Sequence, residues 1–168
     1  MAKLVFRVVL VIAVLVAATV VVRRAMRSEE ELVRSAVLGL IADFESNNVL
    51  LGLDGIKDRL SKDYLHQGER ADYAIDKQMA LAYLYRVKTQ MNYTDFRVEV
   101  RELKVSVLGP AATADFIGRI TAARRGTPEE RRELMTEPGR NRALLDLKKE
   151  DGRWLVSGSR RVEHRLED

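Results

Sequence analysis

The chain contains few side chains of the kinds that hold metals or attack substrates. It has no cysteine, and its two histidines, His66 and His164, lie far apart in the sequence. Without cysteine there is no disulfide, no thiolate metal ligand and no cysteine nucleophile. The histidines show neither the HxH nor the HExxH spacing that brings two imidazoles to one metal ion. We therefore expect no metal site and no cofactor.

Acid–base chemistry requires ionisable groups whose environments push their pKa values apart. Asp115 and Asp146 occupy polar positions of two expected strands, so both should face away from the core. His66 precedes Gly68 in an expected loop, where an imidazole is usually exposed to solvent. There is no glycine-rich phosphate loop and no serine nucleophile elbow, and Gly158 in the SGS stretch fits a bend or bulge in a strand. We therefore expect no catalytic residue.

Three amphipathic helices are expected before any strand. Ser28 and Glu31 have the spacing of a capping box, which predicts a helix over about 29–46. A shorter helix should begin at Asp54 and Gly55, with a loop at 66–70 after it, and a third should cover about 72–91. The apolar residues expected on their buried faces are Val33, Val37, Leu40, Ile41 and Phe44 in the first, Ile56, Leu60 and Tyr64 in the second, and Ile75, Met79, Ala82 and Tyr83 in the third.

The apolar period changes to two from Asp95 onward, which predicts an antiparallel sheet of about four strands. The inward phase flips across Arg101 and Glu102, so a β-bulge is expected there. The third strand is expected at 143–147, after a short helix over 128–135 that Pro128 would start. Asp151 and Gly152 then form a two-residue hairpin turn. Trp154 begins the inward phase of the last strand and should pack between the sheet and the first helix.

An apolar segment at the N-terminus predicts a membrane anchor. Residues 8–22 are fifteen uncharged residues, and residues 4–22 would span about 28 Å as a helix, close to one hydrocarbon thickness. A cleaved signal peptide ending near Ala18 is the alternative, although the apolar run continues to Val22. The absence of Gly and Pro from 23–27 would allow the first amphipathic helix to continue from this segment. We expect an anchor over residues 1–27 and a domain over 28–168. Three basic residues follow the segment and two precede it, so the positive-inside count slightly favours a cytoplasmic domain. A short N-terminal tail before a large domain is the usual layout of a signal anchor with an exported domain, so the domain side leans extracytoplasmic.

The charge distribution argues against nucleic acid as a partner. The formal net charge is +4, but five basic side chains flank the apolar segment. From Ser28 onward 24 basic and 25 acidic side chains remain, so the folded part is nearly neutral. A nucleic-acid-binding domain would need a concentrated basic footprint. The expected partners are the membrane, through residues 4–22, and a protein partner or a second copy bound through the sheet.

Two stretches of the chain resemble the nuclear transport factor 2-like (NTF2-like) superfamily, an α+β cone. Residues 60–68, LSKDYLHQG, resemble the entry of that fold, and residues 145–163, with a charged Asp-Gly turn before an aromatic strand, are similar to its closing hairpin. The resemblance covers about residues 29–164 and implies three helices packed on a curved sheet. It also implies a ligand pocket inside the cone, which we expect to be lined by Tyr64, Tyr83, Phe116 and Trp154.

The superfamily contains enzymes, transport factors and secretion-system subunits, so the fold does not choose a function. We expect non-enzymatic binding or scaffolding of a partner protein or a small apolar ligand at the cell envelope, since an anchor gives little advantage to an enzyme of diffusible metabolites. The alternative is a small lyase or isomerase acting on an apolar substrate. That alternative requires an ionisable side chain such as His66 or Asp146 beside a tyrosine in the cone.

Overall fold

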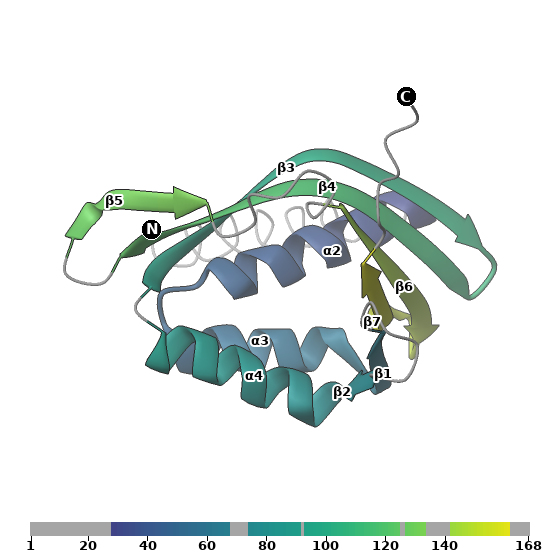
Figure 1. Ribbon diagram of the computed structural model, residues 1–168. Helices are drawn as coiled ribbons and strands as arrows, with labels where there is room; N and C mark the ends of the chain where they lie inside the picture. Colours follow the sequence, from purple (N-terminus) through teal and green to yellow (C-terminus); the bar gives the residue numbers. More distant parts are fainter. Residues whose placement is uncertain (1–27, 68–73, 92, 125–126, 134–141, 162–168) are drawn as a thin grey trace, which may run out of the picture.

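The computed structural model describes residues 28–67, 74–91, 93–124, 127–133 and 142–161. Within these ranges, three helices lie under the concave face of one strongly curved sheet (Figure 1). The helices are α2 Glu29–Glu45, α3 Val49–Arg59 and α4 Lys77–Gln90. The strands are β1 Leu60–Gln67, β2 Ala74–Asp76, β3 Tyr93–Leu108, β4 Ala111–Arg124, β5 Thr127–Glu133, β6 Arg142–Glu150 and β7 Arg153–Arg161.

The sheet is mixed and has more strands than expected. Six strands of the described chain follow the order β2-β1-β7-β6-β4-β3, and β5 adds a seventh by pairing with β4. All neighbours are antiparallel except β1 and β7, which run parallel. The prediction of about four strands is wrong because two strands lie between the helices and one lies in the connection before β6.

Helix α2 begins at the predicted capping box. The Ser28 hydroxyl accepts a hydrogen bond from the Glu31 amide at 3.2 Å, and the Glu31 carboxylate accepts one from the Ser28 amide at 3.2 Å. Ser28 itself is extended, with φ −63° and ψ 153°. The helix therefore begins directly after Ser28, at the capping box that the sequence predicts. Val33 and Val37 are fully buried against the sheet.

The second helix lies earlier in the sequence than predicted. The Asn48 side chain accepts a hydrogen bond from the Leu51 amide and so caps the start of α3. The helix then ends at Arg59. Leu60 already pairs with Val156 of β7, and Tyr64 and His66 lie on strand β1 rather than on a helix and a loop. The helical spacing of Ile56, Leu60 and Tyr64 misled the prediction, because a strand pairing distant in sequence overrides the local pattern. Likewise α4 begins only after Asp76, whose carboxylate caps it, so the expected start at 72 is wrong.

The β3–β4 hairpin is the longest part of the sheet and carries the predicted bulge. The pairing register shifts between Val100 and Glu102, next to the expected position. Strand β4 continues past Ile117, which pairs with the first residue of β6, as far as Arg124 and presents an edge to which β5 pairs. The prediction of a helix over 128–135 is therefore wrong, because an unpaired edge of the sheet is available to this segment.

The β6–β7 hairpin places Trp154 in the core, as predicted. Asp151 and Gly152 have φ of 48° and 76°, the left-handed pair that a tight hairpin turn requires. Trp154 is 6% exposed and belongs to the main apolar cluster with Val33, Val37, Leu147 and Val156. Its indole nitrogen donates to the Glu29 carboxylate at 2.8 Å, so the ring also joins the hairpin to the start of α2.

No helix within the described ranges is long and apolar enough to cross a membrane. The apolar segment 4–22 and the expected anchor and signal-peptide features lie outside the described residues, as do His164 and Gly68.

Candidate functional site

Three polar side chains meet on the core side of the sheet where β1 and β7 run parallel. The Ser159 hydroxyl lies 2.7 Å from the Tyr64 hydroxyl and 2.8 Å from Nδ1 of His66. Tyr64 and His66 are two residues apart on β1 and so share one face of the strand. The Cα of Ser159 is paired with that of His66 on one side and of Leu145 on the other. We call Tyr64, Ser159 and His66 the concave-face cluster.

The concave-face cluster lies at the edge of the apolar core. Leu145, the cross-strand neighbour of Ser159, is 7% exposed, and Tyr64 packs against the same buried cluster. Residues directly opposite in an antiparallel pair share a face, so Ser159 lies on the core face. All three side chains of the cluster are half-buried rather than enclosed. Part of each of these side chains is therefore open to solvent at the edge of the core.

The hydrogen bonds can form one continuous relay through Ser159. A serine hydroxyl has one proton to donate and two lone pairs to accept with, so it can accept from Tyr64 while donating to Nδ1 of neutral His66, or the reverse. Burial raises the pKa of Tyr64, and the hydrogen bond to Ser159 offsets part of that rise. The phenol is therefore neutral at physiological pH and can act as a hydrogen-bond donor.

Carboxylates lie on the opposite face of the sheet. Asp146 is paired with Gly158, one residue before Ser159, and its carboxylate accepts from Arg160 at 3.3 Å. Asp115 binds Arg142 through two hydrogen bonds. Both aspartates thus face away from the core, as predicted, and within the described chain no carboxylate is hydrogen-bonded to the concave-face cluster. The described residues also contain no group of three or more His, Asp or Glu side chains that could hold a metal ion.

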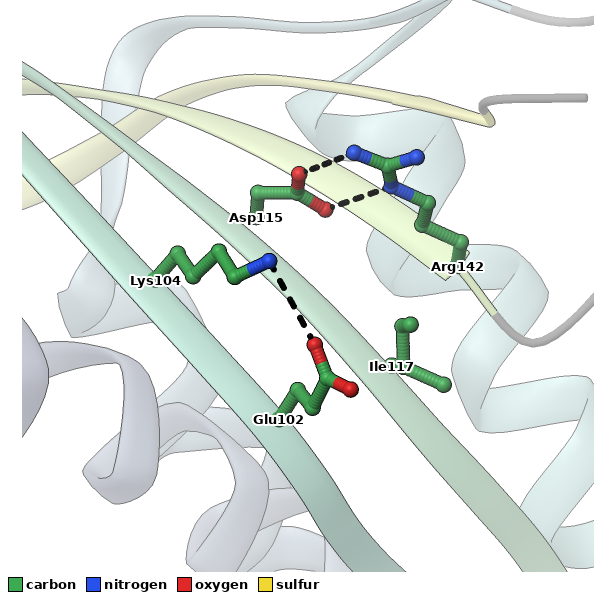
Figure 2. A pocket seen from close by; sticks show the side chains of 5 residues that line it. All are labelled: Glu102, Lys104, Asp115, Ile117 and Arg142. Carbon is green, nitrogen blue, oxygen red and sulfur yellow. Dashed lines mark hydrogen bonds and ion pairs between the residues drawn. The ribbon is translucent and has the colours of Figure 1, made fainter. Parts of the chain in front are cut away.

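A shallow pocket of about 230 Å³ lies on the convex face of the sheet (Figure 2). Its lining residues are Glu102, Lys104, Asp115, Ile117 and Arg142. Lys104 Nζ lies 3.5 Å from the Glu102 carboxylate, and Arg142 is bound to Asp115. Each of its four charges therefore already has a partner of opposite sign. A ligand here would have to compete with these ion pairs.

An open groove of about 640 Å³ follows the outer side of α2, with Arg34 and Arg59 among its lining residues. Arg34 donates to the Leu103 carbonyl oxygen at 3.1 Å, and Arg59 donates to Asp43 at 2.5 Å. The Arg59 guanidinium lies over Gly39, where a Cβ would be only 2.5 Å from it. Both cations are thus already held by groups of the protein.

The predicted pocket residues lie in different environments. Tyr64 belongs to the concave-face cluster, Phe116 is half-buried and packs against the core, and Trp154 is buried. Tyr83 is 58% exposed on α4. His66 was expected to be exposed in a loop, which is wrong because β1 pairs with β7 as far as Gln67.

Ser159 was not identified from the sequence. The feature of the sequence that could have indicated its inward position is Gly158, which lies beside a register shift between Asp146 and Leu147. The extra residue turns Ser159 from the outward to the inward phase.

No protein-family model matches the sequence, and no curated protein is similar enough to be matched. Solved structures do resemble the fold. An NTF2-like protein of unknown function from Pseudomonas putida KT2440 superposes with a TM-score of 0.58 at 14% identity, over 78% of this chain and 83% of that one. The chain has an NTF2-like fold. An NTF2-like protein from Cytophaga hutchinsonii also superposes on the chain, with a TM-score of 0.56 and 14% identity over 80% of this chain and 97% of that one.

A ketosteroid isomerase-like protein from Erwinia carotovora atroseptica is also similar, with a TM-score of 0.55 and 15% identity over 80% of this chain and 95% of that one. These identities are low, so the similarities establish the NTF2-like α+β fold and leave the activity to be argued from the site.

Proposed function

We propose that this chain is a membrane-anchored NTF2-like domain that binds a small, largely apolar ligand with one hydrogen-bonding group at the cell envelope. The observation that carries the proposal is the concave-face cluster, where Tyr64, Ser159 and His66 meet at the edge of the apolar core. Ligand sites typically combine apolar walls with a few polar groups that fix orientation. The hydroxyl groups would bind the polar atom of the ligand, and the core edge would bind the rest.

The proposed anchor is the apolar segment 4–22, which is long enough for one membrane crossing.

Binding can be tested with the full chain in lipid nanodiscs and a panel of small alcohols and ketones, from cyclohexanone and phenol to 2-naphthol. We expect at least one compound to raise the melting temperature. Ser159→Ala should weaken its binding roughly two- to tenfold, which corresponds to one hydrogen bond of about 0.5–1.5 kcal/mol. Ser106→Ala, an exposed serine on β3, is the matched control and should leave binding unchanged. Equal affinities in the two variants would contradict the proposed site.

Acid–base catalysis is the second candidate, and one observation favours it. His66 lies beside Tyr64 through a shared serine, which supplies a proton acceptor and a neutral hydroxyl donor within one relay. A histidine can remove a proton next to a carbonyl group while a phenol stabilises the developing oxyanion. Deuterium exchange next to the carbonyl of panel ketones, followed by NMR in D₂O, tests this function. If the parent chain catalyses exchange and the His66→Gln variant does not, catalysis is established. If the parent shows no exchange above background, binding remains the function.

The convex face of the sheet is the proposed contact surface for a protein partner or a second copy of this chain. Its pocket carries Glu102, Lys104, Asp115 and Arg142, so charges of both signs lie in one patch. Such a mixed patch can be complementary to itself across a two-fold axis. Sedimentation of the full chain in mild detergent tests this role, since a monomer at all concentrations would argue against self-association.

A further inference from the structure

The start of α2 is held against the β6–β7 hairpin. One oxygen of the Glu29 carboxylate accepts from Lys149 Nζ at 2.6 Å, and the other accepts from the Trp154 indole at 2.8 Å. These hydrogen bonds also lower the pKa of Glu29, the larger effect coming from Lys149. Because Trp154 is buried, this end of α2 has a defined position on the domain.

The β3–β4 turn lies at the same end of the molecule. The Lys149 amide donates to the Pro110 carbonyl oxygen at 2.8 Å, which joins the turn to the β6–β7 hairpin. Figure 1 shows the β3–β4 turn, the β6–β7 hairpin and the first turn of α2 together at one end of the cone. Leu108 precedes Gly109 in this turn and is 84% exposed, more than any other large apolar side chain within the described ranges. We call Ser28, Leu108, Gly109, Pro110 and Arg153 the tip surface.

The tether restricts how far the tip surface can lie from the proposed anchor. Only residues 23–27 separate Val22, the last residue of the apolar segment, from Ser28. At about 3.3–3.6 Å per extended residue, this link spans at most about 20 Å. Helix α2 is 17 residues long, or roughly 25 Å. With the proposed anchor in the bilayer, the start of α2 would lie within about 20 Å of the end of the anchor, whereas the start of α3 lies at the opposite end of the domain (Figure 1).

We propose that the tip surface faces and contacts the lipid surface, with Leu108 inserted at the boundary between headgroups and acyl chains. This inference rests on the anchor in the proposed function. The exposed Arg153 lies beside the exposed Asp151 and near the acidic first turn of α2, so the described tip has no excess of basic side chains. Its contact with the lipid would depend on Leu108. The proposal explains why the most exposed large apolar side chain of the described chain lies beside the start of α2.

The absence of cysteine allows a matched test with single-cysteine variants of the full chain. Leu108→Cys places a fluorescent NBD label on the tip surface. Leu50→Cys is the control, because Leu50 is also an exposed leucine, at 69%, but lies in the first turn of α3. Both proteins are reconstituted in phosphatidylcholine–phosphatidylglycerol vesicles that contain nitroxide-labelled lipids. The nitroxides are placed about 5–10 Å into the interface, the depth at which apolar side chains of interfacial segments lie.

The label at position 108 should be quenched strongly, and the label at position 50 should be quenched little. Equal quenching, or stronger quenching at position 50, would overturn the orientation while leaving the anchor intact. Flotation of the same vesicles tests the anchor separately from the orientation of the tip surface. If the full chain does not float with the vesicles, the anchor and the orientation both fail.

Discussion

Ser159 is the residue on which the concave-face cluster depends, because its hydroxyl bonds both Tyr64 and His66. Ser159→Ala should lower the free energy of unfolding by about 1–2 kcal/mol, since the half-buried Tyr64 hydroxyl loses its partner. Chemical denaturation of the variant measures this loss. Ser106→Ala, on the convex face, should stay within about 0.5 kcal/mol of the parent. A Ser159→Ala variant as stable as the parent would mean that the cluster contributes no hydrogen bonding in solution.

The ionisation of Tyr64 makes its contribution to stability depend on pH. Burial raises its pKa above the ordinary value of 10.0, so an unfolded chain releases this proton at lower pH than the folded one. The contribution of Tyr64 to stability is therefore constant below about pH 10 and is lost as the pH rises from there through the folded pKa. Ser159→Ala removes a hydrogen bond that lowers this pKa, so Tyr64 should titrate at still higher pH in the variant. The ¹³Cζ shift of Tyr64, followed by NMR from pH 8 to 12, measures the change, and a lower pKa in the variant would contradict the account.

The residues of the cluster could be predicted only in part from the sequence. Tyr64 was expected to line a pocket, but His66 and Ser159 were not, because their meeting depends on a parallel pairing between segments more than 90 residues apart. The inward position of Ser159 follows from the bulge beside Gly158. A bend or bulge at this glycine was expected from the sequence, but a local pattern does not reveal which partner a strand will have.

At the scale of elements, the β6–β7 hairpin and α2 stabilise each other through Trp154. Trp154→Ala should cost roughly 3–5 kcal/mol, because it empties a core position and removes the indole donor from Glu29. Trp154→Phe keeps most of the apolar volume and should cost much less. Thermal melts of the two variants measure the difference. Similar melting temperatures for Trp154→Ala and the parent would show that the ring is not part of the core.

The elements that the sequence predicted well are those whose contacts are local. The first helix with its capping box, the bulged β3–β4 hairpin and the Asp-Gly turn all depend on residues close in the chain. The elements predicted wrongly depend on distant partners. Leu60 leaves the helical pattern to pair with Val156, and β5 forms only because β4 extends beyond β6.

A lysine on α4 also has a role that its type did not indicate. Lys88 is 6% exposed and donates to the Phe44 and Ser46 carbonyl oxygens at the end of α2.

At the scale of the whole molecule, the NTF2-like cone has two different ends. The tip surface gathers the start of α2, the β3–β4 turn and the β6–β7 hairpin, so a tether at residue 27 would hold that end near a bilayer. The concave-face cluster lies further along β1 and β7, beyond their register shift. An anchored domain in this orientation keeps the cluster accessible from the aqueous side.

The central claim is that ligands bind at the concave-face cluster. The most direct test is an NMR titration of the isotopically labelled full chain in nanodiscs with the compound from the alcohol and ketone panel that stabilises it most. The account predicts concentration-dependent shifts at Tyr64, His66 and Ser159, and none at the convex-face residues Lys104 and Arg142. Saturable shifts at Lys104 and Arg142 with an unchanged Tyr64–Ser159–His66 cluster would contradict it.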